Sequence, residues 1–132
     1  MGIGTAIITE HAYQVIPIDV GTTVGATQAL DFRGFQNGGI WIPTGSTITA
    51  LTFHVAPIDS DADGGRKLFG ADADEVAEAD NYLPAYDELL TAVAYTGLSG
   101  GNAYVIPECL CMFGFIKMVG DAADTVYVSL KG

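Results

Sequence analysis

Alternation of apolar and polar residues with a period of two is the feature that most limits what this chain can fold into. In residues 47–56, the side chains of Leu51, Phe53 and Val55 fall on one face of an extended strand, opposite polar neighbours. Residues 125–130 alternate valine or leucine with polar residues in the same way. Because successive side chains of a strand point to opposite faces, each segment has one face to bury. The pattern predicts antiparallel strands around a shared core.

Turn-forming residues separate further short apolar segments. Seventeen glycines, together with many Val, Ile, Thr and Tyr residues, favour strands joined by tight turns. Asn37-Gly38-Gly39 has the composition of a hairpin turn, and residues 43–46 and 120–121 predict two more turns. The expected strands cover residues 13–16, 30–33, 40–42, 47–56, 82–86, 90–95, 103–106, 112–119 and 125–130. About eight short strands indicate an all-β fold, an antiparallel β-sandwich or jelly roll, with a small barrel as the alternative.

The length of 132 residues fits one domain. Residues 1–26 are rich in Gly, Thr and Ile, and we predict that they form an N-terminal arm that docks on a neighbouring chain. The β-sandwich domain is expected to span residues 27–132. Within it, residues 58–80 form a predicted acidic loop insertion, because eight of the sixteen acidic residues lie between residues 59 and 80.

Charge and hydrophobicity restrict the possible partners. The net charge is −11, from sixteen acidic and five basic residues, and so few cations disfavour nucleic-acid binding. No apolar run reaches the roughly eighteen residues of a membrane span, and the first residues show no signal-peptide pattern. Charged residues make up only 16% of the chain and hydrophobic residues 49%. We therefore expect a soluble protein whose surface is partly covered by other protein chains.

Residues 97–101, Gly-Leu-Ser-Gly-Gly, match the G-x-S-x-G pattern of a hydrolase nucleophile centred on Ser99. That nucleophile needs a strand before it, a helix after it and a large α/β sheet around it. Here a second strand pattern, closed by Pro107, follows the motif, and the chain is short for that fold. We interpret residues 97–101 as a hairpin loop and expect no catalytic residue.

The histidines and cysteines do not form a recognisable site. His11 and His54 are the only histidines, and a general base needs a partner that orients it, which the sequence does not identify. Cys109 and Cys111 lie one residue apart on a predicted strand and are interpreted as small core or partly exposed residues. Two histidines without suitably spaced cysteines do not predict a zinc site.

Asp59-Ser60-Asp61-Ala62-Asp63-Gly64 resembles the start of an EF-hand calcium loop, with three carboxylates around one turn. The twelfth position of such a loop carries a bidentate acid, but here it is Gly70. Asp59, Asp61 and Asp63 are therefore weak calcium candidates. Their simpler interpretation is a solvated acidic loop, so no cofactor or metal is assigned.

Aromatic side chains suggest one further kind of site. Trp41 and the tyrosines at 82, 86, 95 and 104 have the ring faces that stack on sugars. At their spacing on predicted strands, packing in a core or in an interface is the favoured interpretation.

Two segments resemble small virion proteins of tailed bacteriophages, of the head-decoration or cement type. These segments are Gly39-Ile-Trp-Ile-Pro-Thr-Gly-Ser-Thr-Ile-Thr-Ala-Leu-Thr-Phe53, and Phe115-Ile-Lys-Met-Val-Gly120 followed by Thr125-Val-Tyr-Val-Ser-Leu-Lys131. The likeness covers residues 28–131 and includes no catalytic or ligand motif, so no individual functional residue is carried over. It implies a β-sandwich or jelly-roll subunit of a bacteriophage capsid, assembled into the virion in the host cytoplasm. The implied partners are the major capsid protein or other virion proteins, and subunits of that kind commonly form homotrimers.

Two other classes of function remain as alternatives. A tail, neck or fibre module that binds a host glycan or another virion protein predicts an exposed aromatic cluster on one face. A small enzyme that uses Ser99 or the acidic loop predicts a concave pocket with perturbed side chains. A structural decoration protein predicts neither, but a broad and flat interface for other protein chains.

Overall fold

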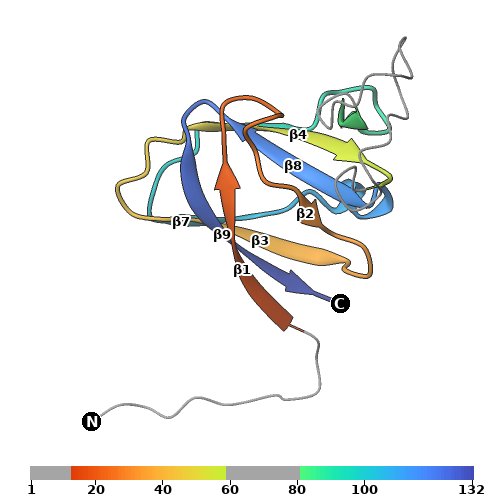
Figure 1. The fold of residues 1–132 in the computed structure, drawn as a ribbon, viewed down its shortest axis with the longest axis horizontal. Coiled ribbons are helices and arrows are strands. Elements are labelled where there is room, and N and C mark those ends of the chain that lie inside the picture. Colours follow the sequence, from red (N-terminus) through yellow and green to blue (C-terminus); the bar gives the residue numbers. More distant parts are fainter. Residues whose placement is uncertain (1–12, 59–80) are drawn as a thin grey trace.

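Two antiparallel β-sheets face each other in the structure, a computed structural model that describes residues 13–58 and 81–132. Figure 1 shows the two sheets crossing, with β1 and β9 side by side in the lower layer and β4 and β8 in the upper one. The strands are β1 Tyr13–Val20, β2 Leu30–Asp31, β3 Asn37–Ile42, β4 Ala50–Ala56, β5 Leu83–Pro84, β6 Ala94–Thr96, β7 Asn102–Val105, β8 Phe115–Gly120 and β9 Asp124–Lys131. A short 3₁₀ helix, Glu108–Met112, precedes β8.

The strand order is that of a jelly roll. Sheet A has the order β1-β9-β3-β7, and sheet B has the order β2-β8-β4-β5, with β6 also paired to β4. First and last strands pair (β1 with β9), and the next pairs inward are β2 with β8, β3 with β7 and β4 with β6. Such nested antiparallel pairs, wrapped so that they alternate between two sheets, define a jelly roll. The expected fold class is thereby confirmed.

The core lies between the sheets and uses the alternating residues of each strand. In β4, Leu51, Phe53 and Val55 are buried, whereas Thr52 is exposed. The ring of Phe53 meets that of Tyr95 edge to face, with centroids 5.5 Å apart. The Tyr95 hydroxyl then donates a hydrogen bond of 2.6 Å to the carbonyl of Val105 in β7. Tyr95 therefore joins sheet B, where it resides, to sheet A.

The loop between β1 and β2 covers part of the outer side of sheet B. Lys117 of β8 is buried there, and its Nζ donates to the carbonyl of Val24 in the loop at 3.1 Å. The same ammonium lies 4.7 Å from the ring centroid of Tyr82. Ala56, Tyr82 and Phe115 form a second, smaller apolar cluster beside it. The charged end of Lys117 is thus held by a carbonyl and an aromatic face.

The turn between β8 and β9 is tied to the start of β4 by one carboxylate. Asp121 accepts hydrogen bonds from the hydroxyl and backbone N–H of Thr49 and from the N–H of Ala50. The Thr49 hydroxyl contributes most to lowering the pKa of Asp121 below its ordinary value, followed by the Thr49 N–H. Desolvation acts in the opposite direction.

The N-terminal part of the sandwich begins earlier than the sequence indicated. Residues 13–20 form β1, which pairs with β9 along its whole length, so they belong to sheet A rather than to an arm. Ile18 and Val20 are buried in the core. Residues 1–12, the remainder of the expected arm, and residues 59–80, most of the expected acidic insertion, lie outside the described residues.

Three local predictions need correction. Asn37-Gly38-Gly39 forms the start of β3 instead of a turn, and the chain turns earlier, at Gly34, where φ is 82°. Residues 97–101 connect β6 of sheet B to β7 of sheet A, so they form a link between sheets rather than a hairpin loop. Cys109 and Cys111 lie in the 3₁₀ helix and not on a strand. Glycine occurs both in residues 37–39 and in residues 97–101, and composition alone does not distinguish a strand from a turn or a link between sheets there.

Candidate functional site

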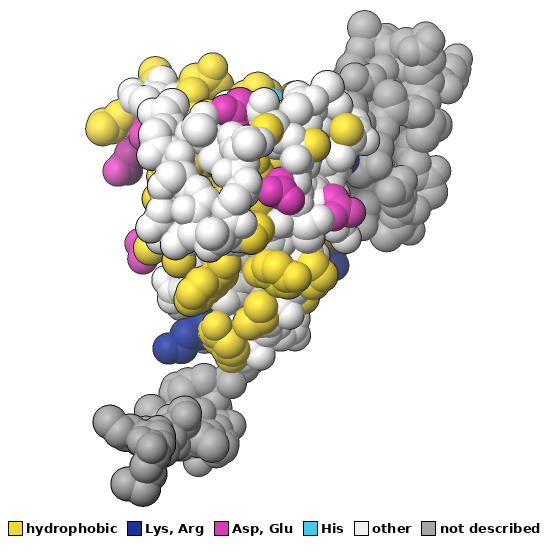
Figure 2. Space-filling view, turned by 90° about the vertical axis from the view of Figure 1, so that its left-hand side faces the viewer, with side chains coloured by type: hydrophobic (Ala, Val, Ile, Leu, Met, Phe, Trp, Pro, Cys, Tyr) yellow, Lys and Arg dark blue, Asp and Glu magenta, His cyan; other side chains and the backbone are white. Residues whose placement is uncertain are grey.

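The outer side of sheet A carries exposed apolar side chains on all four of its strands. These large exposed residues, here called the apolar face, are Tyr13, Val15, Trp41, Val105 and Tyr127, which are 48–67% exposed. Figure 2 shows hydrophobic side chains gathered on the lower part of this side of the molecule, with few charged side chains among them. Single exposed apolar residues are ordinary, but a contiguous group on one sheet indicates an interaction surface.

Strand register places the apolar face in two rows across the sheet. The first row crosses the four strands through Pro17, Tyr127, Trp41 and Ala103, and each is the direct cross-strand neighbour of the next. The second row, two residues away along the strands, contains Val15, Ser129, Gly39 and Val105. None of these eight side chains is charged. These two rows are therefore continuous and largely apolar, and Lys131 lies beyond them as the cross-strand neighbour of Tyr13.

Trp41 is held in place at the centre of the apolar face. Its indole Nε1 donates a hydrogen bond of 2.9 Å to Oγ of Ser129 on the neighbouring strand. A Cβ at Gly39 would stand 2.8 Å from that same Oγ and 3.4 Å from Nε1, so the absence of a side chain there gives the indole its space. A ring fixed in this way loses little conformational entropy when a partner covers it, which is a property of interface hot spots.

A shallow hollow of about 280 Å³ borders Trp41 and Tyr127. Thr44 and Asn102 add polar groups to its lining. The Asn102 amide is already engaged, since its Nδ2 lies 2.7 Å from Oγ of Ser99 and donates to it. The aromatic pair with polar groups at its margin is the arrangement that also suits a sugar ring.

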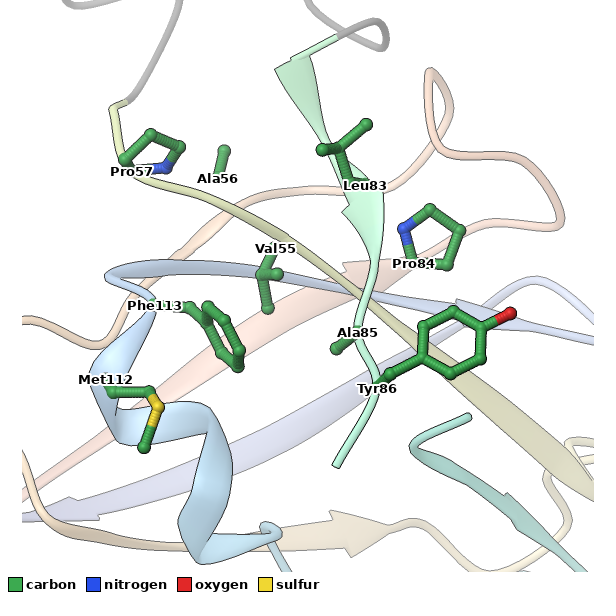
Figure 3. A pocket seen from close by; sticks show the side chains of 9 residues that line it. All are labelled: Val55, Ala56, Pro57, Leu83, Pro84, Ala85, Tyr86, Met112 and Phe113. Carbon is green, nitrogen blue, oxygen red and sulfur yellow. The ribbon is translucent and has the colours of Figure 1, made fainter. Parts of the chain in front are cut away.

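A larger hollow, about 460 Å³, lies at the other end of the sandwich on sheet B. Figure 3 shows its nine lining side chains, which come from the end of β4 and the proline after it, from β5 and the residues after it, and from the end of the 3₁₀ helix and the residue that follows it. Apart from the hydroxyl of Tyr86, these side chains offer no acid, base or nucleophile. The lining described here supports apolar contact.

Ser99 lacks the surroundings of a nucleophile. Its Oγ accepts a hydrogen bond from the Asn102 amide, and its backbone N–H donates to the Tyr104 hydroxyl at 3.0 Å. The hydrogen bonds found in residues 13–58 and 81–132 do not connect Ser99 to a histidine or a carboxylate. A serine needs such a base to act as a nucleophile.

His54 lies on the outer side of sheet B, opposite Lys117 across the β4–β8 pair. Its Nδ1 is buried without a hydrogen-bond partner. Burial lowers the pKa of His54 below its ordinary value of 6.5, because desolvation penalises the charged ring. A histidine of this kind favours the neutral form in the folded protein.

We expect His54 to make folding stability pH-dependent. Its pKa is lower in the folded than in the unfolded state, so the unfolded state takes up the proton first as the pH falls below about 6.5. Stability should therefore decrease from pH 7.5 to 5.5, and His54→Gln should flatten that decrease. Urea-denaturation midpoints measured across this range test the prediction, with His11→Gln as the control. Equal pH dependence in the wild type and in His54→Gln would contradict it.

The remaining candidate residues are dispersed. Tyr82 is buried, Tyr95 and Tyr104 pack against the core, and Tyr86 borders the large hollow on sheet B, so these tyrosines do not line one face with Trp41. Asp59, Asp61 and Asp63, the calcium candidates, lie outside the described residues, as does His11. Cys109 and Cys111 are free thiols. In the part of the chain that the structure describes, no group of three or more His, Cys, Asp or Glu residues is placed to hold a metal ion.

Tyr127, the cross-strand neighbour of Trp41, and Tyr13, further along the apolar face, were not among the aromatic residues that the sequence suggested for a sugar site. Their signal was present in the alternation of β9 and β1, where both tyrosines occupy outward positions. The alternation does not reveal which strands are the neighbours of β3.

None of the helical residues described is part of a helix long and apolar enough to span a membrane. No protein-family model matches the chain, and neither a curated protein nor a solved structure matches it. The physical features of its surfaces are thus the basis for any statement about its role.

Proposed function

We propose that this chain is a non-enzymatic structural module whose apolar face packs against another protein chain in a larger assembly. The observation that carries the proposal is the largely apolar surface that runs across all four strands of sheet A, with the Trp41 indole hydrogen-bonded to Ser129 within it. Surfaces of this type bind through buried aromatic anchors surrounded by less critical contacts. The mostly apolar lining of the large hollow also favours contact with protein over catalysis.

The specific role that we propose is that of a capsid decoration, or cement, subunit of a bacteriophage head, present in the virion as a homo-oligomer. The resemblance of residues 39–53 and 115–131 to such proteins supports it, and jelly rolls are frequent among capsid proteins. Fold alone does not determine function, so the proposal depends mainly on the apolar face. A decoration subunit needs many moderate contacts, which repeated copies convert into strong binding.

Replacing Trp41 should impair assembly without impairing folding. In an add-back experiment, heads that were assembled without this chain are incubated with the purified protein, and bound protein is measured after sedimentation. We expect saturable binding, reduced about 30-fold or more by Trp41→Ser, because a central aromatic anchor contributes about 2 kcal/mol or more to such an interface. Leu89→Ser removes an apolar side chain that is even more exposed and lies away from the apolar face, and it is the control.

Two outcomes would contradict the proposal. One is wild-type protein that stays in the supernatant with the heads at every concentration tested. The other is equal loss of binding in the Trp41 and Leu89 variants at unchanged melting temperatures. Either result would mean that the apolar face is not the surface by which this chain joins such a particle.

Glycan recognition by a tail, neck or fibre module is the second candidate. The specific observation in its favour is the exposed Trp41–Tyr127 pair, with Thr44 and Asn102 beside it. The two candidates differ in their response to free sugars. A glycan site predicts that millimolar sugar changes the fluorescence of Trp41, the single tryptophan of the chain, whereas a protein-binding surface predicts no change.

A further inference from the structure

β1 forms an outer edge of sheet A and has backbone groups that face away from the molecule. These groups belong to the odd-numbered residues, because Asp19 directs its N–H and C=O away from β9, towards Gln28. In an antiparallel strand both groups of a residue point to the same side, and the side changes with each residue. Tyr13, Val15 and Pro17 therefore also direct their backbone groups outward.

In the second half of this edge, the outward backbone groups of Asp19 already form hydrogen bonds. The Gln28 side chain accepts from the Asp19 N–H at 3.0 Å, and the Gln28 N–H donates to the Asp19 carbonyl at 2.9 Å. Pro17 has no N–H to offer. The open groups are the N–H and C=O of Tyr13 and Val15 and the C=O of Pro17, which form no hydrogen bond with any part of the chain that the structure describes.

The other sheet edges are less suited to pairing. β7, at the far side of sheet A, has four residues, and the Val105 carbonyl is already occupied by the Tyr95 hydroxyl. β2 and β5, at the edges of sheet B, have two residues each. β1 has eight residues and no charged side chain between Tyr13 and Ile18. Proteins usually protect such edges with charges, particularly lysine.

We propose that β1 pairs antiparallel with β1 of a second copy, about a two-fold axis at Val15. In this register, Val15 of each copy exchanges both backbone hydrogen bonds with Val15 of the other. Tyr13 lies opposite Pro17 of the second copy and donates its N–H to the proline carbonyl. The missing donor of Pro17 thus leaves just one acceptor per copy, the Tyr13 carbonyl, without a partner in the new ladder.

Self-complementarity is the reason to name a second copy as the partner. Residues 13–17 contain the donors and acceptors that residues 13–17 of another copy require. Exposed apolar side chains also match, since Val15 meets Val15 and the ring of Tyr13 lies over Pro17, all on the outer side of sheet A. The two apolar faces then form one surface across eight strands, twice the four of a single sheet A.

This inference goes beyond the proposed function, because it is argued from the open edge of sheet A alone. A two-fold axis closes after two copies, so β1 pairing gives a dimer, in contrast to the trimer that the resemblance implies. Because each copy carries a net charge of −11, salt that screens the repulsion should strengthen the dimer.

Cross-linking tests the register. Facing residues of a hydrogen-bonded antiparallel pair have Cα atoms about 5.5 Å apart, which a disulfide can bridge. Val15→Cys should therefore form a disulfide-linked dimer under mild oxidation. Tyr13→Cys should not, because Tyr13 lies opposite Pro17, about 14 Å from Tyr13 of the second copy. Both variants are made in full-length protein with Cys109→Ser and Cys111→Ser, so that the native thiols do not react.

Mass in solution tests the edge itself. Light scattering of the wild type over a concentration series should show a dimer, and Val15→Pro should raise its dissociation constant at least about tenfold by removing the central donors. Val105→Pro makes the same change on the opposite edge of sheet A and should leave the dissociation constant of the dimer unchanged. If a proline variant folds poorly, Val15→Glu and Val105→Glu replace the pair, since two glutamates at the axis repel each other.

Three results would overturn the pairing: a wild type that remains monomeric at high salt, equal effects of the Val15 and Val105 variants, or cross-linking that is as efficient at Tyr13 as at Val15. None of them decides the proposed function, which is tested by the binding of Trp41→Ser to heads. Conversely, a confirmed dimer that does not bind heads would leave the pairing intact and remove the proposed role.

Discussion

Replacing Phe53 with alanine is expected to cost about 3–5 kcal/mol of folding free energy, the usual range for a buried phenylalanine. Phe53 is 1% exposed and lies in the middle of β4. Its ring supports Tyr95 edge to face, and Tyr95 in turn holds the Val105 carbonyl of the opposite sheet. The substitution therefore removes core volume and also loosens a connection between the two sheets.

Urea denaturation of Phe53→Ala measures this loss directly. Thr52→Ala is the matched control, because Thr52 precedes Phe53 on the same strand but is exposed, and surface substitutions of that kind usually change stability by about 0.5 kcal/mol or less. A domain of this size commonly has a total stability of about 5–15 kcal/mol, so the loss is a large share of it. A change below about 1 kcal/mol in Phe53→Ala would show that the core is packed differently.

Gly21→Ala is expected to destabilise the protein by about 1–3 kcal/mol through overpacking. A Cβ at Gly21 would lie 2.5 Å from the carbonyl oxygen of Ala26 and 2.8 Å from the Ala26 Cβ. Backbone atoms cannot rotate away as a flexible side chain does. The Gly21 carbonyl also accepts from Gly120, so the glycine has little freedom to move in the other direction.

Gly25→Ala, in the same loop, is the control with the opposite expectation. A Cβ at Gly25 would meet nothing within 4 Å, and its φ is not in the left-handed region. Alanine restricts the unfolded chain at such a position, so Gly25→Ala should be neutral or should stabilise by up to about 1 kcal/mol. Thermal melting of both variants provides the comparison. Equal melting temperatures would contradict the close approach at Gly21.

Much of the fold follows from the period of two in the sequence. Alternation in β4 and β9 correctly identified both strands and the side chains that they bury. The same logic identified only residues 13–16 of β1, because Pro17 interrupts the pattern of a strand. Proline is tolerated there because position 17 faces the open edge, and only the sheet order reveals that β1 lies at an edge.

Glycine was the least informative signal. Gly38 and Gly39 resemble a hairpin turn in sequence, yet they lie within β3 because neighbouring atoms occupy the space of a side chain. The Cδ1 atom of Ile106 would be 2.6 Å from a Cβ at Gly38, and Ser129 Oγ would be 2.8 Å from one at Gly39. A close approach between distant parts of the chain selects the same residue as a turn does.

The candidate site was predictable only in part. Trp41 was identified as a residue with binding potential, but its neighbour Tyr127 comes from a strand far along the chain. The two meet because β3 pairs with β9, in a register that places Trp41 opposite Tyr127. Alternation predicts which residues point outward from each strand. It does not predict which strands become neighbours, and that step assembles the apolar face.

The position of β9 in sheet A has a consequence for how the protein is made. β9 is the last strand in the chain, yet it lies between β1 and β3, which do not pair with each other. A ribosome adds about 5–20 residues per second. During most of the synthesis of the chain, β1 is therefore present without its partner β9. Sheet A can therefore close only when residues 124–131 have left the ribosome, so translation that stops before Asp124 leaves β1 without a partner strand and β3 paired with β7 alone, and the open strand edges are prone to aggregation.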